Sequence, residues 1–510
     1  MSILGTGFGN SWSGWVPQTL TKIHDDLNSK SVQLATGKIA TTNSGLGSTV
    51  YQTLDLQSRL SGCDLYSDSI VSVGTDITTS INAVSSLSDA ANATKNGALA
   101  AVNSSDAAGR SSRQTQLKSV LTSLLGYVNT RGVNGYIFGG ANTSSPPAES
   151  LDTILGGDAS TGKDGLTTLV AERQQADLGS DGLGRMAITG TTTQVTLTSP
   201  ASTLPFGMSI KNVSSTFSHG TASLTSSAPP TMMADFSTGV PQSGETVTIT
   251  LNLPDGSTTP LIMTAGTSNC NGTFALGATA ADTASNFQSA LTTTVKQIAN
   301  VQLFSASALK QATDFFSSST TNPPQRVLAG TDGTLKTATA FSTDASSNSN
   351  KTICWYSGTD ANSGGDPRQD VSNLIGDGIR IGIGVRGNEK GFSETIAALA
   401  AAAAVSPSKS DETLANMQFS ELATRSSNQL TTGLSDLQSI TASLATSQNA
   451  VKSESTNQTA YKSILQQAFD SKTSITPEQA ATDLSALQTQ LQVAYQVTSR
   501  LMKMSLADYL

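Results

Sequence analysis

The sequence predicts an α+β protein: an elongated antiparallel helical stalk built from both chain ends, with an inserted β-rich head. Residues 1–140 and 376–510 carry apolar residues at helical spacing, including long stretches at heptad spacing. Residues 141–375 contain many Gly and Thr residues, and their apolar residues alternate with polar ones, as is typical of strands. Because both ends are helical, they can pair, and the insert of one or two modules would then project from the far end of the rod.

Four apolar residues predict the first helix. Pro17 fits the first helical position, where its missing N–H costs no hydrogen bond, and Gly37 fits a left-handed cap after the last turn. The stripe between them has spacings of three, four and seven and consists of Leu20, Ile23, Leu27 and Leu34.

The second helix carries the strongest periodic signal, because apolar or small residues recur at every seventh position and predict a coiled-coil seam. At ~1.5 Å per residue this helix is roughly 65–70 Å long, which exceeds the diameter of a compact domain. A third apolar stripe begins at Leu117 and ends before Arg131. The seam of the second helix consists of Leu56, Cys63, Ile70, Ile77, Val84, Ala91 and Ala98.

The middle of the chain predicts a small α+β module. The apolar side chains of residues 247–253 alternate, residues 254–256 (Pro-Asp-Gly) form a turn, and residues 261–263 begin a return strand. Residues 282–299 predict an amphipathic helix with Phe287 on its apolar face. We expect residues 342–349 to form a flexible surface loop.

The C-terminal part returns to helix after a last strand over residues 379–385. Residues 476–479 (Thr-Pro-Glu-Gln) are a strong helix start, with Thr476 as the cap and proline at the first position. Apolar residues at heptad positions precede this start and a second stripe follows it. They are Leu430, Leu437, Leu444, Val451 and Leu465, and then Leu484, Leu487, Leu491, Ala494, Val497 and Leu501.

Composition excludes several classes of protein. Lys and Arg number 29 and Asp and Glu 37, a net charge of −8, and no basic cluster is present for nucleic acid. The three cysteines, Cys63, Cys270 and Cys354, match no disulfide framework or zinc pattern. The longest apolar run, residues 396–405, is too short for a bilayer, and no signal peptide is visible at the N-terminus. We therefore expect no nucleic-acid binding and no membrane insertion.

Two motif-like stretches predict neither a cofactor nor a metal. Residues 382–387 match a dinucleotide fingerprint, but the apolar alternation runs through the glycines, and no second strand follows the Ala-rich helix. Residues 360–366 resemble a calcium loop, but Val371 stands where a bidentate Glu is needed. With two histidines and no recognisable nucleophile–base pattern, the sequence predicts no cofactor, no metal, no catalytic residues and no enzyme.

The terminal stripes predict self-association. They are too large to remain exposed on a soluble monomer, and they would be buried by packing against copies of the same chain. A head-to-tail contact of this kind does not close and builds a helical filament or tube. Charged residues are 13% of the chain, against about 25% in an ordinary domain. This low charge suits helices that pack densely.

Several segments resemble the bacterial flagellin family. Residues 33–38 (Gln-Leu-Ala-Thr-Gly-Lys) resemble the segment after the first flagellin helix. Residues 134–140 (Asn-Gly-Tyr-Ile-Phe-Gly-Gly), 491–500 and 505–510 (Ser-Leu-Ala-Asp-Tyr-Leu) are similar to the hook–filament junction members of that family. The resemblance covers about half of the chain. Residues 41–49 lack the usual acidic, proline-containing stretch, and the insert is long for a junction protein.

The resemblance implies a structural subunit of the bacterial flagellum at the hook–filament junction, extracellular and exported unfolded through the type III channel without a cleaved signal peptide. It implies ends that are disordered in the monomer and fold on assembly, and as partners copies of itself, the hook-side junction protein, flagellin and an export chaperone. Leu56, Cys63, Ile70, Ile77 and Val84 would form the stalk seam. The expected assembly interface consists of Leu20, Ile23, Leu27, Leu34, Leu487, Leu491, Val497, Leu501, Leu506 and Leu510.

Three alternatives remain open from the sequence. The first is the flagellin of the filament itself, which shares the same helical ends. The second is a surface adhesin or phage fibre, whose ends would form a stable trimer. The third is an enzyme carried in the insert, which would need an acidic or nucleophilic cleft within residues 141–375.

Overall fold

The computed structural model describes residues 12–99, 106–225, 228–360 and 364–507. The described structure mixes helix and sheet, with 56% helix and 15% strand, and the predicted α+β class is compatible with this content. It forms two compact units. Unit 1 comprises Met1–Val71, Leu374–Arg380 and Val451–Leu510, and unit 2 comprises Ser72–Asn373 and Ile381–Ala450. Each unit combines segments from the N-terminal and C-terminal halves of the chain, and neither unit ends near residue 140. The predicted domain boundaries near residues 140 and 375 therefore stay predictions.

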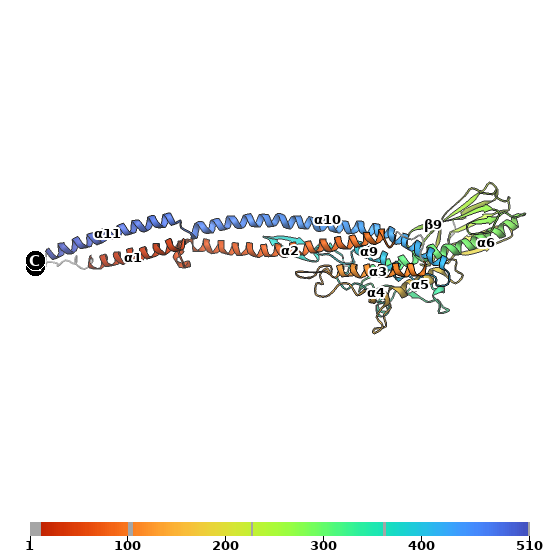
Figure 1. Cartoon of the computed structure of the whole chain (residues 1–510), viewed down its shortest axis with the longest axis horizontal. Helices are drawn as coiled ribbons and strands as arrows, with labels where there is room; N and C mark the ends of the chain where they lie inside the picture. The colour runs from red at the N-terminus through yellow and green to blue at the C-terminus, as the bar shows by residue number, and fades with distance from the viewer. Residues whose placement is uncertain (1–11, 100–105, 226–227, 361–363, 508–510) are drawn as a thin grey trace, which may run out of the picture. The chain divides into compact units, whose positions relative to one another are not determined.

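Unit 1 is built from helices. It contains α1 (Trp12–Thr36), the 3₁₀ turn η1 (Asn43–Thr49) and α11 (Pro477–Ala507), together with the first part of α2 (Val50–Asn96) and the last part of α10 (Glu412–Thr473). In this unit α1 lies beside α11 (Figure 1).

Two of the three predicted helix signals in this unit are confirmed. Gly37 has a φ of +67° after the last turn of α1, and the Thr476 hydroxyl accepts a 3.2 Å hydrogen bond from the Gln479 N–H at the start of α11. The prediction for Pro17 is wrong, because α1 already includes Trp12 and Pro17 lies inside the helix. An interior proline costs a helix one intrahelical hydrogen bond. The sequence therefore favoured the first helical position for Pro17, where no such bond is lost.

The helices of unit 2 pack around a long antiparallel pair. Gln448 on α10 donates to Thr78 on α2, and Lys95 on α2 donates to Thr431 on α10. Thr78 and Lys95 are 17 residues apart on α2, and Thr431 and Gln448 are 17 residues apart on α10 in the reverse order. These two contacts therefore fix the antiparallel register. The heptad series itself runs beyond the helix, because α2 ends at Asn96 and the buried Ala98 lies in the turn that follows.

Five further helices complete this helical layer. Their bounds are α3 (Ala107–Val128), α4 (Leu151–Gly156), α5 (Leu166–Leu178), α7 (Phe304–Phe316) and α9 (Lys390–Ala404). The Ala-rich α9 is buried on nearly every side, because small side chains let α3, α5 and α7 approach it. The β-rich label for residues 141–375 therefore missed α4, α5 and α7.

Two four-stranded sheets and one helix form a β module in unit 2. The strands are β3 (Ala187–Gly190), β4 (Gln194–Thr198), β5 (Ser209–Ser215), β6 (Thr221–Thr225), β7 (Thr231–Asp235), β8 (Thr246–Asn252), β9 (Thr258–Gly266) and β10 (Thr273–Ala275). Their orders are β10-β9-β8-β5 and β3-β4-β7-β6. Helix α6 (Ala280–Ile298) lies beside the strands of this module (Figure 1) and packs against both sheets. Its Phe287 is buried in the shared core. The β8–β9 hairpin and α6 confirm the sequence predictions.

Short elements connect these parts. The π-helical turn η2 (Ala299–Leu303) joins α6 to α7. The others are β1 (Arg131–Gly132), β2 (Gly135–Tyr136), β11 (Val327–Leu328), η3 (Leu335–Thr337), β12 (Ala340–Phe341), α8 (Ala345–Lys351), η4 (Pro367–Gln369), β13 (Ser372–Gly376) and β14 (Ile379–Gly382).

Two of these elements correct predictions. Helix α8 replaces most of the flexible loop expected over residues 342–349, because the Asp344 side chain caps it by accepting from the Ser346 N–H at 3.0 Å. The last strand ends at Gly382 rather than at residue 385, because residues 383–387 turn to meet another part of the chain.

Candidate assembly surface

An apolar groove lies between α1 and α11 in unit 1. The two helices are antiparallel, and Lys30 on α1 pairs with Asp483 on α11 at 2.7 Å. The groove has a volume of about 340 Å³ and opens at the surface. We call it the assembly groove, and it is lined by Thr19, Leu20, Ile23, Thr489, Gln490, Val493, Ala494, Val497 and Thr498.

The side chains of the groove leave much apolar surface in contact with water. Val493 and Val497 are 53% and 50% exposed, although both are aliphatic. Tyr495 and Met502 on α11 and Val32 on α1 are also exposed large apolar residues. Of these five residues, Val493 and Val497 line the groove.

The charge of unit 1 is nearly balanced. Its sequence contains 10 Lys and Arg and 11 Asp and Glu, a net charge of −1, whereas the whole chain carries −8. Copies of this unit would therefore repel one another weakly at close approach.

The predicted interface residues divide into two groups. Leu20, Ile23, Leu27, Leu487 and Leu491 are half-buried in unit 1, whereas Leu34 and Val497 count among its exposed apolar residues. Leu501 and Leu506 belong to α11. Leu510 lies outside the residues that the structure describes. Val493, which sequence reasoning missed, lines the groove because it lies one turn before Val497.

The predicted stalk seam lies on one face of α2. Leu56 is half-buried, and Cys63, Ile70, Ile77 and Val84 are buried. On α10, heptad residues from Leu430 to Leu465 are likewise buried. These positions form the packed faces of the two helices rather than a free surface.

The segment 134–140 forms a tight turn in unit 2. Its first residues belong to the β1–β2 hairpin, where the Asp76 carboxylate accepts from the Val133 N–H at 2.7 Å and from the Asn134 amide at 3.0 Å. Gly135 has a φ of +121°, and a Cβ there would lie 2.4 Å from the Thr143 carbonyl oxygen. This position therefore requires glycine.

The end of that segment is bonded to residues 385–387. The Gly387 N–H donates to the Phe138 carbonyl at 2.8 Å, and the Gly140 N–H donates to the Val385 carbonyl at 3.2 Å. The Tyr356 hydroxyl also donates to the Phe138 carbonyl, at 2.7 Å. Burial raises the pKa of the Tyr356 phenol, so it remains a donor at neutral pH. The chain that leaves α3 is thus fixed to the chain that leads into α9.

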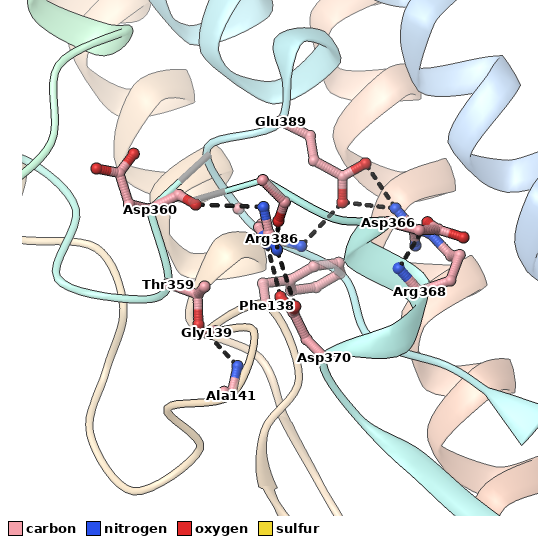
Figure 2. A network of polar contacts seen from close by, with 12 residues as sticks. Phe138, Gly139, Ala141, Thr359, Asp360, Asp366, Arg368, Asp370, Arg386 and Glu389 are labelled. Atoms are coloured by element: carbon pink, nitrogen blue, oxygen red, sulfur yellow. Dashed lines mark hydrogen bonds and ion pairs between the residues drawn. The ribbon is translucent and has the colours of Figure 1, made fainter. Parts of the chain in front are cut away.

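Two ion pairs, each between a buried arginine and a half-buried carboxylate, lie at this junction, as Figure 2 shows. We call Arg386, Asp370, Arg368 and Glu389 the Arg386 network. Arg386 pairs with Asp370, and Arg368 donates to both carboxylate oxygens of Glu389 at 2.5 and 2.6 Å. Glu389 also accepts from the Arg386 backbone N–H at 2.9 Å, which joins the two pairs. Burial raises the pKa of Glu389, and the two arginines oppose that effect.

Arg386 also contacts the stretch that resembles a calcium loop, residues 360–366. Its guanidinium donates to the carbonyl oxygens of Asp360 at 3.2 Å and Gly364 at 3.3 Å. These carbonyls therefore contact a side-chain cation. Figure 2 shows the contact between Arg386 and Asp360. Sequence reasoning missed this network. The available signal was Arg386 itself, a charged residue that interrupts an apolar Gly-rich stretch.

The chemistry of these sites is that of packing and ion pairing. Within the residues that the structure describes, no three His, Cys, Asp or Glu side chains gather as metal ligands would. None of the described helices combines the length and the apolar character needed to cross a bilayer. No protein-family model matches the chain, and no curated protein matches its sequence.

Proposed function

We propose that this protein is a structural subunit of the bacterial flagellum that self-assembles through its terminal helices at the hook–filament junction. In this proposal both chain ends form a helical stalk, and the β-rich insert forms its head. The partners are copies of the chain, the hook-side junction protein and flagellin, with an export chaperone before secretion. The proposal places the protein outside the cell, after export without a cleaved signal peptide, and assigns it no catalytic step.

The assembly groove is the observation that carries this proposal. It is made by the two helices nearest the chain ends, which are the segments whose sequences resemble the flagellin family. When a neighbouring helix covers half-exposed aliphatic side chains such as Val493, the burial of their apolar surface lowers the free energy of the assembly. The small net charge of unit 1 favours dense packing of copies, because it keeps the electrostatic repulsion between them weak.

A polymerisation assay tests the role of the groove. We expect the purified chain to form sedimenting tubes when ammonium sulfate strengthens apolar contacts. Val493→Asp should abolish sedimentation, because it brings a charge into the groove. Leu328→Asp is the matched control, since Leu328 is 49% exposed on β11 in unit 2, and it should sediment like the parent chain. Equal sedimentation of the two variants would exclude the groove as the assembly surface.

Immunogold electron microscopy of the source bacterium tests the position in the flagellum. Antibodies against this chain should label a short zone between the hook and the filament. Label along the whole filament would overturn the junction assignment in favour of filament flagellin. Label on cell-surface structures other than flagella would favour an adhesin and overturn the flagellar proposal.

A further inference from the structure

Two helix breaks far apart in the sequence meet in unit 1. Helix α1 ends at Thr36, and α10 ends at Thr473, three residues before α11 begins. Lys38 and Ser474 pair at these breaks as an antiparallel β-bridge. The Ile39 N–H donates to the Thr473 carbonyl at 2.7 Å. The Ile475 N–H donates to the Gly37 carbonyl at 3.0 Å.

The bridge is tied to both terminal helices. On the α1 side, the Gln33 amide donates to the Ile39 carbonyl at 2.7 Å, and the Gly37 N–H donates to the Gln33 carbonyl at 2.8 Å. On the α11 side, Thr476 caps the helix immediately after Ile475. Each partner of the bridge is therefore continuous with the end of one terminal helix, so a distortion of the bridge reaches both helices.

We infer that this bridge couples α1 and α11 into one cooperative unit, so that the two helices form and open together. The first turn of an α-helix is unfavourable to form, and a helix in a protein obtains most of its stability from packing against its neighbours. The bridge joins segments more than 430 residues apart and meets the loop-closure cost once for both helices. With the bridge formed, the start of α11 lies against the end of α1, where Lys30 and Asp483 pair.

The coupling has a consequence for the assembly groove, and this part rests on the proposed function. The groove is composite, because Leu20 and Ile23 come from α1 whereas Val493 and Val497 come from α11. If a chain lacks either helix, or if its bridge is open, the α1 and α11 side chains of the groove are not held side by side. The surface for other copies would then exist only on a chain whose two ends are both in place.

Hydrogen exchange measured by mass spectrometry on the full chain tests the coupling. Ile39→Pro removes the N–H that donates to Thr473, and it should accelerate exchange about five- to thirtyfold in both α1 and α11, the factor for one lost interaction. Ile39→Ala keeps that N–H and is the matched control, so exchange in α11 should stay close to the parent value. Peptides from α3 report on unit 2 and should not change in either variant.

Three results would overturn the inference. The first is faster exchange in α1 alone after Ile39→Pro. The second is an equal effect of Ile39→Ala and Ile39→Pro on α11. The third is full exchange of both helices in the parent chain at the earliest time point, which is the result that chain ends disordered in the monomer, as the flagellin resemblance implies, would give. None of these readouts requires polymerisation, so a failure of the coupling and a failure of the flagellar proposal are separate results.

Discussion

The guanidinium of Arg386 donates two hydrogen bonds to the carboxylate of Asp370, at 2.6 and 2.8 Å, and only 2% of the Arg386 residue is exposed. An ion pair that lies mostly out of water adds little stability compared with apolar residues of similar size. Removing one of its partners is nevertheless costly, because the other charge is left without a partner. The pair lies where the segment 134–140 meets residues 385–387, so its loss should loosen that junction.

Removal of one partner should strongly destabilise unit 2. Arg386→Met leaves the half-buried Asp370 carboxylate without its arginine partner, and we expect a loss of about 3–5 kcal/mol in the free energy of unfolding. Urea denaturation followed by circular dichroism measures this loss. The double variant Arg386→Met, Asp370→Leu should recover most of it, since no unpaired charge remains. A single-variant effect below about 0.5 kcal/mol, the usual range for surface changes, would show that the pair does not hold this junction.

Calcium should not stabilise the protein. The carbonyls of Asp360 and Gly364 accept hydrogen bonds from the Arg386 guanidinium, whose positive charge also repels a metal ion. If calcium bound the folded protein, a free concentration 100 times its dissociation constant would raise the free energy of unfolding by about 2.7 kcal/mol. A thermal melt resolves a change of that size easily. We therefore expect the same melting temperature in millimolar calcium chloride and in EDTA. A higher melting temperature in calcium would contradict this account of the loop.

The heptad seam of α2 should be sensitive to truncation on one face only. Ile77 is fully buried, so Ile77→Ala should lower the free energy of unfolding by about 2–5 kcal/mol through lost contacts and a cavity. Leu65 on the same helix is 71% exposed, and Leu65→Ala should change stability by no more than about 0.5 kcal/mol. Both variants are compared by urea denaturation. Similar losses would mean that the buried face has been assigned wrongly.

Periodicity identified the elements in which one face is buried. The seam from Cys63 to Val84, the alternation in β8 and the apolar face of α6 all show in the sequence, because each repeats a burial pattern over several turns or residues. Cap residues were equally informative where they acted locally. Thr476 and Gly37 stabilise the helix ends that their positions indicate.

The remaining features depend on contacts that sequence spacing does not encode. Helices α5 and α7 have only 13 residues each and lie in a Gly- and Thr-rich region, so composition obscured them. Asp370 and Arg386 are 16 positions apart, and the segment 134–140 meets residues nearly 250 positions away. The assembly groove needs two helices from opposite ends of the chain, so its stripes could be predicted but its missing member, Val493, could not.

A half-buried carboxylate, Glu394, should make stability depend on pH. Glu394 lies on α9, 3.6 Å from the Lys390 ammonium, and the same ammonium lies 3.4 Å from Asp436. Burial raises the pKa of Glu394 and the Asp436 charge raises it further, whereas Lys390 lowers it. The folded protein thus holds this proton more tightly than the unfolded chain does. Stability from this group is greatest below the ordinary glutamate pKa of about 4.3 and is lost as pH rises through the raised value.

Glu394→Gln removes that titration while nearly preserving the shape of the side chain. We expect the variant to be more stable than the parent chain at pH 7, where the parent must bury a charge, and to differ from it by no more than about 0.5 kcal/mol at pH 4. Urea denaturation at pH 4, 5, 6 and 7 measures the difference at each value. Asp26→Asn is the control, because it removes a carboxylate that is exposed on α1. A variant that loses stability as pH rises would mean that the attraction of Lys390 outweighs the cost of burial.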